Sequence, residues 1–252
     1  MKKLLFLSII TLMSLNIYSQ ASGDYVSITS GNWGDPHTWR IYPDVMPAST
    51  APDANTTVSI FIENGHTVTA DAASFDNQYY KAPIFISGTL QFGDKGASGI
   101  AGFENDVTID GGTLTNNATT PYDILYFHTK LKIEGNGNLT TTTVLAVDDF
   151  YLLDDATATV EETYSFDYTS GANNTIALAS GTTLTIGSKM VFTEGTNLGV
   201  HSGASLVLNP ASIEILGHAT FTIDKYTKLY GNLDIKTGGH LELKGTSRLQ
   251  VR

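Results

Sequence analysis

Apolar and polar residues alternate along most of this chain in short runs that are typical of half-buried β-strands. Residues 107–109 (Val-Thr-Ile) and 184–186 (Leu-Thr-Ile) are examples. Because successive side chains of a strand point to opposite faces, this pattern places the aliphatic residues inward and the threonines outward. None of these segments sustains the 3.6-residue apolar spacing of an amphipathic helix. The hydrophobic pattern therefore predicts an all-β protein.

The strand pattern recurs with a period of about two dozen residues, each unit pairing an apolar residue with a glycine turn and a second apolar residue. The first leading residues are spaced by 24, 23 and 24 residues, and the later ones by 45, 22, 15 and 20. They are Ile62, Ile86, Ile109, Ile133, Leu178, Val200, Ile215 and Ile235. The interval of 45 indicates two units, with a degenerate one around residues 157–160. The two short final intervals indicate either tighter coils or an alignment displaced by one strand.

A fixed period of this size, carried by β-forming residues and glycine turns, predicts a β-solenoid. One coil cannot bury its apolar stripe alone, whereas stacked coils can, with strands about 4.8 Å apart. The crossover preference of parallel strands makes the expected fold a right-handed parallel β-helix. Residues 58–252 would form this helix. Residues 22–57 carry four of the seven prolines and would form an N-terminal cap over its open end.

The first residues have the pattern of a secretory signal peptide. Lys2 and Lys3 precede an apolar run over residues 4–15, and Ser19 and Ala21 place small residues before a predicted cleavage site. The run is too short for a membrane span. We therefore expect residues 1–21 to be removed and the protein to be secreted or displayed on the cell surface, without membrane insertion.

The last residues retain strand alternation without a cap. Leu241, Leu243, Leu249 and Val251 would form the apolar inner side of a final coil. We expect the chain to be a fragment of a longer exported protein, truncated at its C-terminus. An uncapped parallel edge would recruit other chains, so the recombinant protein is expected to self-associate.

The net charge of the chain limits its possible partners, and the lack of cysteine limits its covalent modifications. Without the two leader lysines, 12 basic residues stand against 25 acidic ones, a formal charge of −13. Such a surface argues against nucleic acid and anionic membranes as partners. The chain has no cysteine, so it lacks disulfides and the residue that would carry a lipoprotein lipid.

Three segments resemble a known family. Residues 30–39 read SGNWGDPHTW, residues 58–69 read VSIFIENGHTVT, and residues 84–92 read IFISGTLQF. Over residues 30–115 the chain is similar to the eight-glycine domain family, extracellular β-helical modules of secreted Bacteroidetes proteins. The resemblance implies a secreted or surface-exposed, often multidomain protein. Many such proteins end in a type IX secretion sorting domain, which this sequence does not show.

Two tryptophans and a ladder of polar residues are the first candidates for a site. Trp33 and Trp39 could stack on sugar rings, although we favour large apolar plugs at the end of the solenoid. The residues that follow the leading isoleucines would form a ladder on adjacent coils, with Asp110 and Glu134 about 5 Å apart. Such a pair could hold calcium or cleave a glycoside. We favour a solvated turn edge. The ladder comprises Glu63, Ser87, Asp110 and Glu134.

Other polar residues are weaker candidates. The acid pairs Asp148-Asp149 and Asp154-Asp155 are expected to mark loops of the degenerate coil. The histidines show no metal-ligand spacing, and no nucleophile elbow is present. With 14 basic residues in the whole chain, the basic cluster of a polyuronate lyase is hard to assemble. The histidines are His37, His66, His128, His201, His218 and His240.

The residues that flank the central leucine of each unit point outward and are mostly threonine. Regular arrays of this kind on flat solenoids resemble ice-binding faces, although threonine also suits exposed β positions in general. Gln91, Asn138, Val207 and Glu242 interrupt the array. The predicted pairs are Thr89 with Gln91, Thr113 with Thr115, Asn138 with Thr140, Thr183 with Thr185, and Thr220 with Thr222.

Together these patterns favour a non-catalytic β-solenoid module with a structural, adhesive or glycan-binding role on an exported protein. We assign no catalytic, cofactor-binding or metal-binding residue and expect no cofactor. The expected partner is a polysaccharide or a cell-surface glycan. The alternative is a β-helix enzyme that degrades polysaccharides, a lyase or glycoside hydrolase, and ice binding is the third hypothesis.

Overall fold

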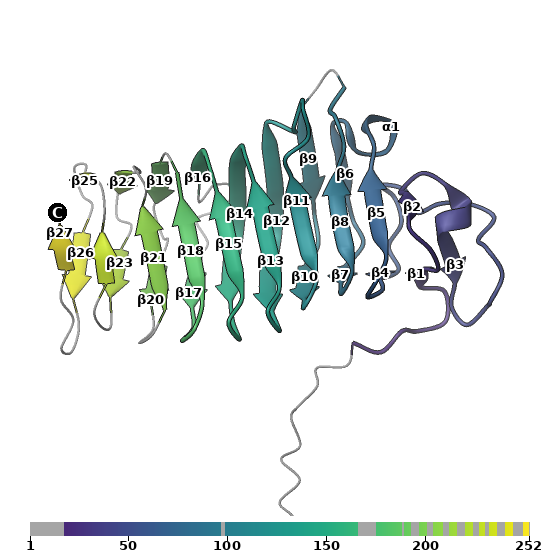
Figure 1. The fold of residues 1–252 in the computed structure, drawn as a ribbon, viewed down its shortest axis with the longest axis horizontal. Helices are drawn as coiled ribbons and strands as arrows, with labels where there is room; N and C mark the ends of the chain where they lie inside the picture. The colour runs from purple at the N-terminus through teal and green to yellow at the C-terminus, as the bar shows by residue number, and fades with distance from the viewer. Residues whose placement is uncertain are drawn as a thin grey trace, which may run out of the picture.

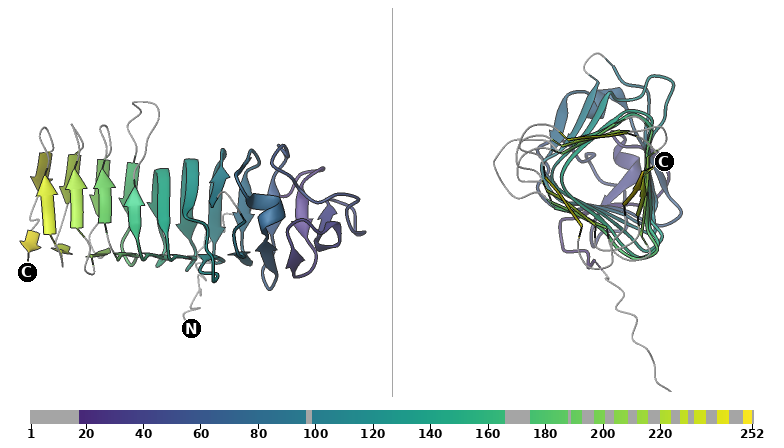
Figure 2. Two further views of the ribbon diagram at one scale, coloured as in Figure 1. Left: turned by 90° about the horizontal axis from the view of Figure 1, so that it is seen from above. Right: turned by 90° about the vertical axis from the view of Figure 1, so that its left-hand side faces the viewer.

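The protein is an elongated stack of coils built almost entirely from parallel strands (Figure 1). The structure is a computed structural model that describes residues 18–252 except 97–98, 166–174, 188, 193–196, 201–203, 209–211, 216–219, 224–226, 230–231, 236–239, 244–248 and 252. Viewed along the stack, the coils overlay one another (Figure 2). The predicted all-β class and the parallel β-helix are confirmed.

Each coil contributes strands to three faces of the stack, which we call face 1, face 2 and face 3. Face 1 contains β4 (Ile60–Ile62), β7 (Ile84–Ile86), β10 (Val107–Asp110), the second halves of β12 (Ile124–Glu134) and β14 (Val144–Leu152), β17 (Thr175–Leu178), β20 (Asn197–Val200), β23 (Thr220–Ile223) and β26 (His240–Leu243). Face 2 contains β2 (Gly31–Asn32), β5 (Thr67–Ala70), β8 (Thr89–Phe92), β11 (Thr113–Asn116), β13 (Asn138–Thr141), β15 (Thr157–Val160), β18 (Thr183–Ile186) and β21 (Ser205–Leu208).

Face 3 begins with short strands and includes the first halves of the two long, bent strands β12 and β14. It contains β6 (Gln78–Tyr80), β9 (Ile100–Phe103), those halves, β16 (Thr163–Ser165), β19 (Lys189–Phe192), β22 (Ser212–Ile215) and β25 (Asn232–Ile235). β24 (Thr227–Leu229) pairs with β27 (Leu249–Val251) in a separate two-stranded sheet. No helix in the described part of the chain has the length and apolar character that a membrane span requires.

The N-terminal segment extends the sheets and covers the first coil (Figure 1). β1 (Tyr25–Ser27) pairs in parallel with β4 and antiparallel with β3 (Trp39–Ile41). β2 pairs with β5, and a short 3₁₀ helix, η1 (Pro36–Thr38), precedes β3. Because β3 pairs antiparallel with β1, the parallel sheet does not end in an unpaired parallel strand on this side.

The leading residues of the repeat form one column on face 1. Ile62, Ile86, Ile109 and Ile133 pair in register on successive coils, as predicted. Leu152 occupies the next position, so the interval of 45 residues does contain two coils. The column then continues through Leu178 and Val200.

The predicted positions Ile215 and Ile235 are wrong, and the alternative of an alignment displaced by one strand is correct. Ile215 lies on face 3, where it pairs with Phe192 and Ile235. The column on face 1 continues instead through Ile223 and Leu243. Strands on all three faces share the same alternation, so the pattern alone does not tell one face from the next.

Among the side chains that the structure describes, the inward ones form one continuous apolar core from Trp33 to Leu206. Near the capped end, α1 (Ala72–Phe75) is a one-turn insertion that the sequence did not predict. Asp71 caps it by accepting a hydrogen bond from the Ser74 N–H at 2.9 Å. Its Phe75 ring packs edge-on against Trp33, with ring centroids 4.9 Å apart. The insertion thereby supplies aromatic bulk beneath the cap.

Candidate functional site

In the described part of the chain, the outer side of face 2 carries two regular columns of short, mostly polar side chains. Between the columns, the inward residues Leu90, Leu114 and Leu139 are completely buried. Register fixes both columns from coil to coil. The first column is Thr67, Thr89, Thr113, Asn138, Thr157, Thr183 and Ser205, and the second is Thr69, Gln91, Thr115, Thr140, Thr159, Thr185 and Val207.

Around Asn138, side chains of the two columns hydrogen-bond to one another. The Asn138 amide donates to the Thr157 hydroxyl at 2.6 Å, and the Thr140 hydroxyl donates to the Asn138 carbonyl at 3.1 Å. Neighbouring coils repeat about every 4.8 Å, and the columns lie two residues apart along each strand, about 7 Å. Face 2 is therefore a two-dimensional array of hydroxyl and methyl groups with fixed spacings.

The array differs from the predicted one at both ends and in the degenerate coil, and it begins one coil earlier, at Thr67 and Thr69. Thr220, Thr222 and Glu242 belong to face 1, so they neither extend nor interrupt it. Thr157 and Thr159 were not paired in the prediction, but they continue both columns without a gap. Ala158 replaces the central leucine in that coil, which removed the signal by which the other coils were recognised.

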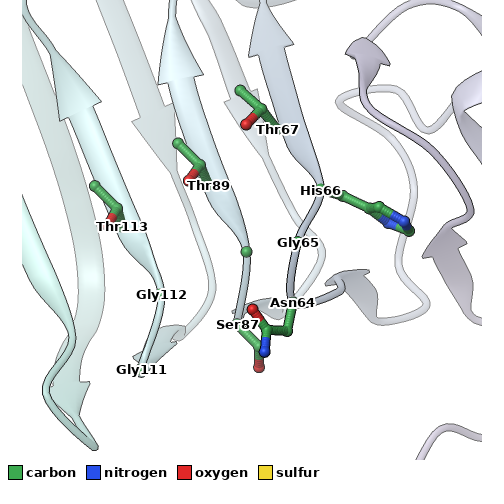
Figure 3. A pocket seen from close by; sticks show the side chains of 10 residues that line it. Asn64, Gly65, His66, Thr67, Ser87, Thr89, Gly111, Gly112 and Thr113 are labelled. Carbon is green, nitrogen blue, oxygen red and sulfur yellow. The ribbon is translucent and has the colours of Figure 1, made fainter.

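A shallow, open groove lies where face 1 turns into face 2 (Figure 3). It is lined by residues 64–67, 87–89 and 111–113, mostly glycine, threonine and backbone. The His66 side chain points away from the groove, and its Nδ1 lies 2.9 Å from the Ser27 hydroxyl. That hydroxyl also accepts from the Glu63 N–H at 2.9 Å, and Ser27 is buried. The serine–histidine contact thus joins the cap to the first coil rather than facing the groove.

The predicted carboxylate neighbours are brought together. Asp110 and Glu134 pair in register on adjacent coils. Burial raises the pKa of the Asp110 carboxyl, and the negative charge of Glu134 raises it further, against the opposing effect of Lys132. Glu134 is only 3% exposed and its carboxylate lies 2.7 Å from the Lys132 ammonium. Glu134 is therefore a buried, paired group rather than part of a solvated turn edge.

The tryptophan interpretation that we favoured is confirmed. Trp33 and Trp39 are completely buried, and their rings pack edge to face with centroids 5.1 Å apart. Their indole N–H groups donate to backbone carbonyls, Trp33 to Pro52 at 3.0 Å and Trp39 to Trp33 at 2.7 Å. Both side chains are plugs of the capped end and are covered from any sugar.

The acid pairs and the histidines do not form one site. Asp154 and Asp155 have positive φ in the turn after β14, as expected of a loop, whereas Asp148 and Asp149 lie within β14, contrary to expectation. Among the described residues no group of three or more histidines and carboxylates could hold a metal ion.

The three histidines whose side chains the structure describes, His37, His66 and His128, have different neighbours. His37 contacts Asp35 at 3.1 Å. His128 lies between Tyr79 and Tyr126 on face 3, where burial lowers the pKa of its imidazole. His201 and His218 lie outside the described residues, as does the side chain of His240.

Comparisons of this chain with models of protein families, with curated proteins and with solved structures find no match. The resemblance to the eight-glycine domain family therefore stays a prediction. Function is inferred from the geometry of the described residues.

Proposed function

We propose that this protein is an exported, non-catalytic β-solenoid module that binds a repetitive polysaccharide through face 2. The observation that carries the proposal is the pair of in-register columns on face 2. A surface that repeats in two directions suits a ligand that repeats, because each coil can make the same contact with successive sugar units. A small molecule would use only one or two coils of such a surface.

The chemistry of the columns supports the same ligand. A threonine hydroxyl both donates and accepts hydrogen bonds, and its methyl group offers apolar contact. Sugar hydroxyls and axial C–H groups need these two kinds of contact. The side chains are short and held on a stack of strands, so little rotamer entropy is lost on binding. The predicted leader and the acidic composition support an extracellular location.

The test is retention of the protein on insoluble cellulose and chitin. We expect the unmodified chain to be retained on at least one of them in high salt, since the columns carry no charge. The double variant Thr115→Lys/Thr159→Lys should lose retention about tenfold or more, because buried ammonium groups are costly at a contact. If the unmodified chain is retained on neither polymer, the proposal is overturned.

A matched control separates a specific effect from added charge. Val45 and Met46 are 80% and 70% exposed in the capping segment, away from face 2. The variant Val45→Lys/Met46→Lys adds the same two charges and should be retained like the unmodified chain. Equal loss in both variants would mean that retention follows overall charge rather than face 2. Release of soluble sugar that Glu134→Ala abolishes would favour the enzyme alternative instead.

Ice is a second candidate ligand for the same face. Threonine occupies ten of the fourteen positions in the two columns, which favours a lattice of water as well as a sugar lattice. The longer amide side chains of Asn138 and Gln91 fit a polysaccharide better than they fit a flat ice plane. Ice binding would be favoured if a solution of the protein froze below its melting point and if the variant Thr115→Lys/Thr159→Lys abolished that difference.

A further inference from the structure

Two aromatic rings lie next to each other on the outer side of face 1. Phe61 and Phe85 pair in register on β4 and β7, and their rings stack with centroids 4.8 Å apart and planes 15° apart. Thr108 and then Lys132 continue the same outward column on the next two coils. Since outward positions of a soluble sheet are ordinarily polar, a stacked phenylalanine pair requires a cover.

Tyr18 supplies that cover. Its ring lies on Phe85, with centroids 4.4 Å apart. Its hydroxyl donates to the Glu134 carboxylate at 2.9 Å and accepts from the Lys132 ammonium at 3.1 Å. Two residues further on, the Gln20 amide donates to Glu63 at 2.5 Å.

The contact has the character of a built binding site. Glu134 is more than nine-tenths buried and directs one carboxylate oxygen to the Tyr18 hydroxyl and the other to Lys132. The Lys132 ammonium also lies 5.8 Å from the centre of the Tyr18 ring. An apolar platform with a few fixed polar groups at one end is the usual construction of a small-ligand site.

Tyr18 belongs to the segment 1–21 that the sequence predicts to be removed on export. Its removal would uncover the Phe85 ring that it packs on, next to Phe61, and would leave the Glu134–Lys132 pair with open hydrogen-bonding positions. Exposed aromatic surface and a partly desolvated ion pair both gain from a replacement ligand. The position that the Tyr18 side chain occupies on face 1 would then be open to another ligand.

We propose that export uncovers a sugar-binding site on face 1, formed by Phe61, Phe85, Lys132 and Glu134, which takes a gluco-configured pyranose in the place of the Tyr18 ring. A pyranose whose hydroxyls are all equatorial has flat faces of C–H groups that stack on aromatic rings. Its hydroxyls project near the ring plane, as the phenol hydroxyl of Tyr18 does. The site is separate from face 2, and it stands whether or not face 2 binds a polysaccharide.

The experiment compares three forms of the protein with cellohexaose and with p-cresol, the side-chain analogue of tyrosine. The forms are the full chain, the full chain with Tyr18→Ala, and the exported product with its N-terminus identified by mass spectrometry. Binding is followed by saturation-transfer NMR and calorimetry. We expect Tyr18→Ala and the exported form to bind cellohexaose about tenfold or more tightly than the full chain does, with p-cresol competing.

Substitutions at the platform distinguish this site from face 2. In the Tyr18→Ala chain, Phe85→Ala should weaken cellohexaose binding about tenfold, and Phe85→Trp should preserve it. Thr159→Ala, on face 2, should leave the p-cresol-sensitive part unchanged. A melting temperature like that of the parent excludes loss through unfolding.

Three results would overturn the proposal. The first is an exported product that retains Tyr18. The second is cellohexaose binding that p-cresol and Phe85→Ala leave unaffected, which would place the sugar elsewhere. The third is binding of p-cresol without cellohexaose, which would identify a phenol site instead.

Discussion

At the scale of single residues, Asn116 is a polar side chain placed inside the apolar core. It is completely buried at the end of β11, and its amide donates to the Tyr122 carbonyl at 2.8 Å and to the Thr143 hydroxyl at 2.9 Å. Its own carbonyl accepts from the Tyr122 N–H at 3.0 Å. The side chain therefore satisfies both backbone groups of Tyr122, where the chain passes from β11 to β12.

We predict that Asn116→Ala lowers the free energy of unfolding by about 3 kcal/mol, because it leaves buried backbone groups of Tyr122 without partners. Denaturant unfolding measures the loss. Thr115→Ala, one residue earlier on the outer side of the same strand, is the control and should change stability by about 0.5 kcal/mol or less. Equal losses in the two variants would show that the amide network is not what stabilises this loop.

Asp110 makes stability depend on pH in the direction opposite to most carboxylates. Burial and the neighbouring Glu134 raise its pKa in the folded protein, so folding favours the protonated form. Its ionised form therefore costs stability at neutral pH, and the cost disappears as the pH falls below the folded pKa. Asp110→Asn should raise the melting temperature at neutral pH, with a gain that shrinks toward acidic pH. A gain that is constant with pH would contradict this account.

At the scale of elements, glycines at the turns between face 1 and face 2 let successive coils approach. A Cβ on Gly112 would lie 2.6 Å from the Gly88 carbonyl oxygen, and one on Gly137 would lie 2.8 Å from the Ile109 carbonyl oxygen. Gly111, directly before Gly112, and Gly135, two residues before Gly137, have positive φ instead. The turn thus needs glycine for two reasons, a left-handed conformation at one position and space at a later one.

We predict that Gly112→Ala destabilises the protein by about 2 kcal/mol or more, since backbone atoms of the previous coil must move. Gly199→Ala is the matched control, because a Cβ there would meet its nearest atom, the Ile176 carbonyl oxygen, at an ordinary 3.8 Å. Thermal unfolding of the two variants provides the comparison. A Gly112→Ala protein as stable as Gly199→Ala would mean that coil spacing adjusts freely.

The sequence predicts the elements best where one face carries a distinctive residue type. The isoleucine column from Ile62 to Ile133 is recognisable because glycine turns follow it at constant spacing. The later coils lose this marker, and Ile215 on face 3 is then indistinguishable from a residue of face 1. The Glu134 carboxylate accepts a hydrogen bond from the Tyr18 hydroxyl, 116 residues away in the chain, and no local pattern encodes that contact. The sequence does contain a signal for the aromatic pair on face 1. The run Ile-Phe-Ile at residues 60–62 and 84–86 places a phenylalanine outward on two successive coils.

At the scale of the whole molecule, the stack turns a local alternation into a large ordered surface. Face 2 is an eight-stranded parallel sheet, and each added coil extends both columns by one side chain. The core and the cap fix the coils relative to one another, so the spacing of the columns is a property of the fold. Binding strength at such a surface should come from many weak, equal contacts rather than from one strong residue.

The most direct test of face 2 as the binding surface is NMR of threonine methyl groups in the presence of a soluble oligosaccharide of the retained polymer. We predict that the signals of Thr113, Thr115, Thr140 and Thr159 shift together on titration. Thr38, which is 1% exposed within the capping segment, serves as the internal control and should not shift. Shifts that spare the columns of face 2 while the oligosaccharide is bound would contradict the proposed function.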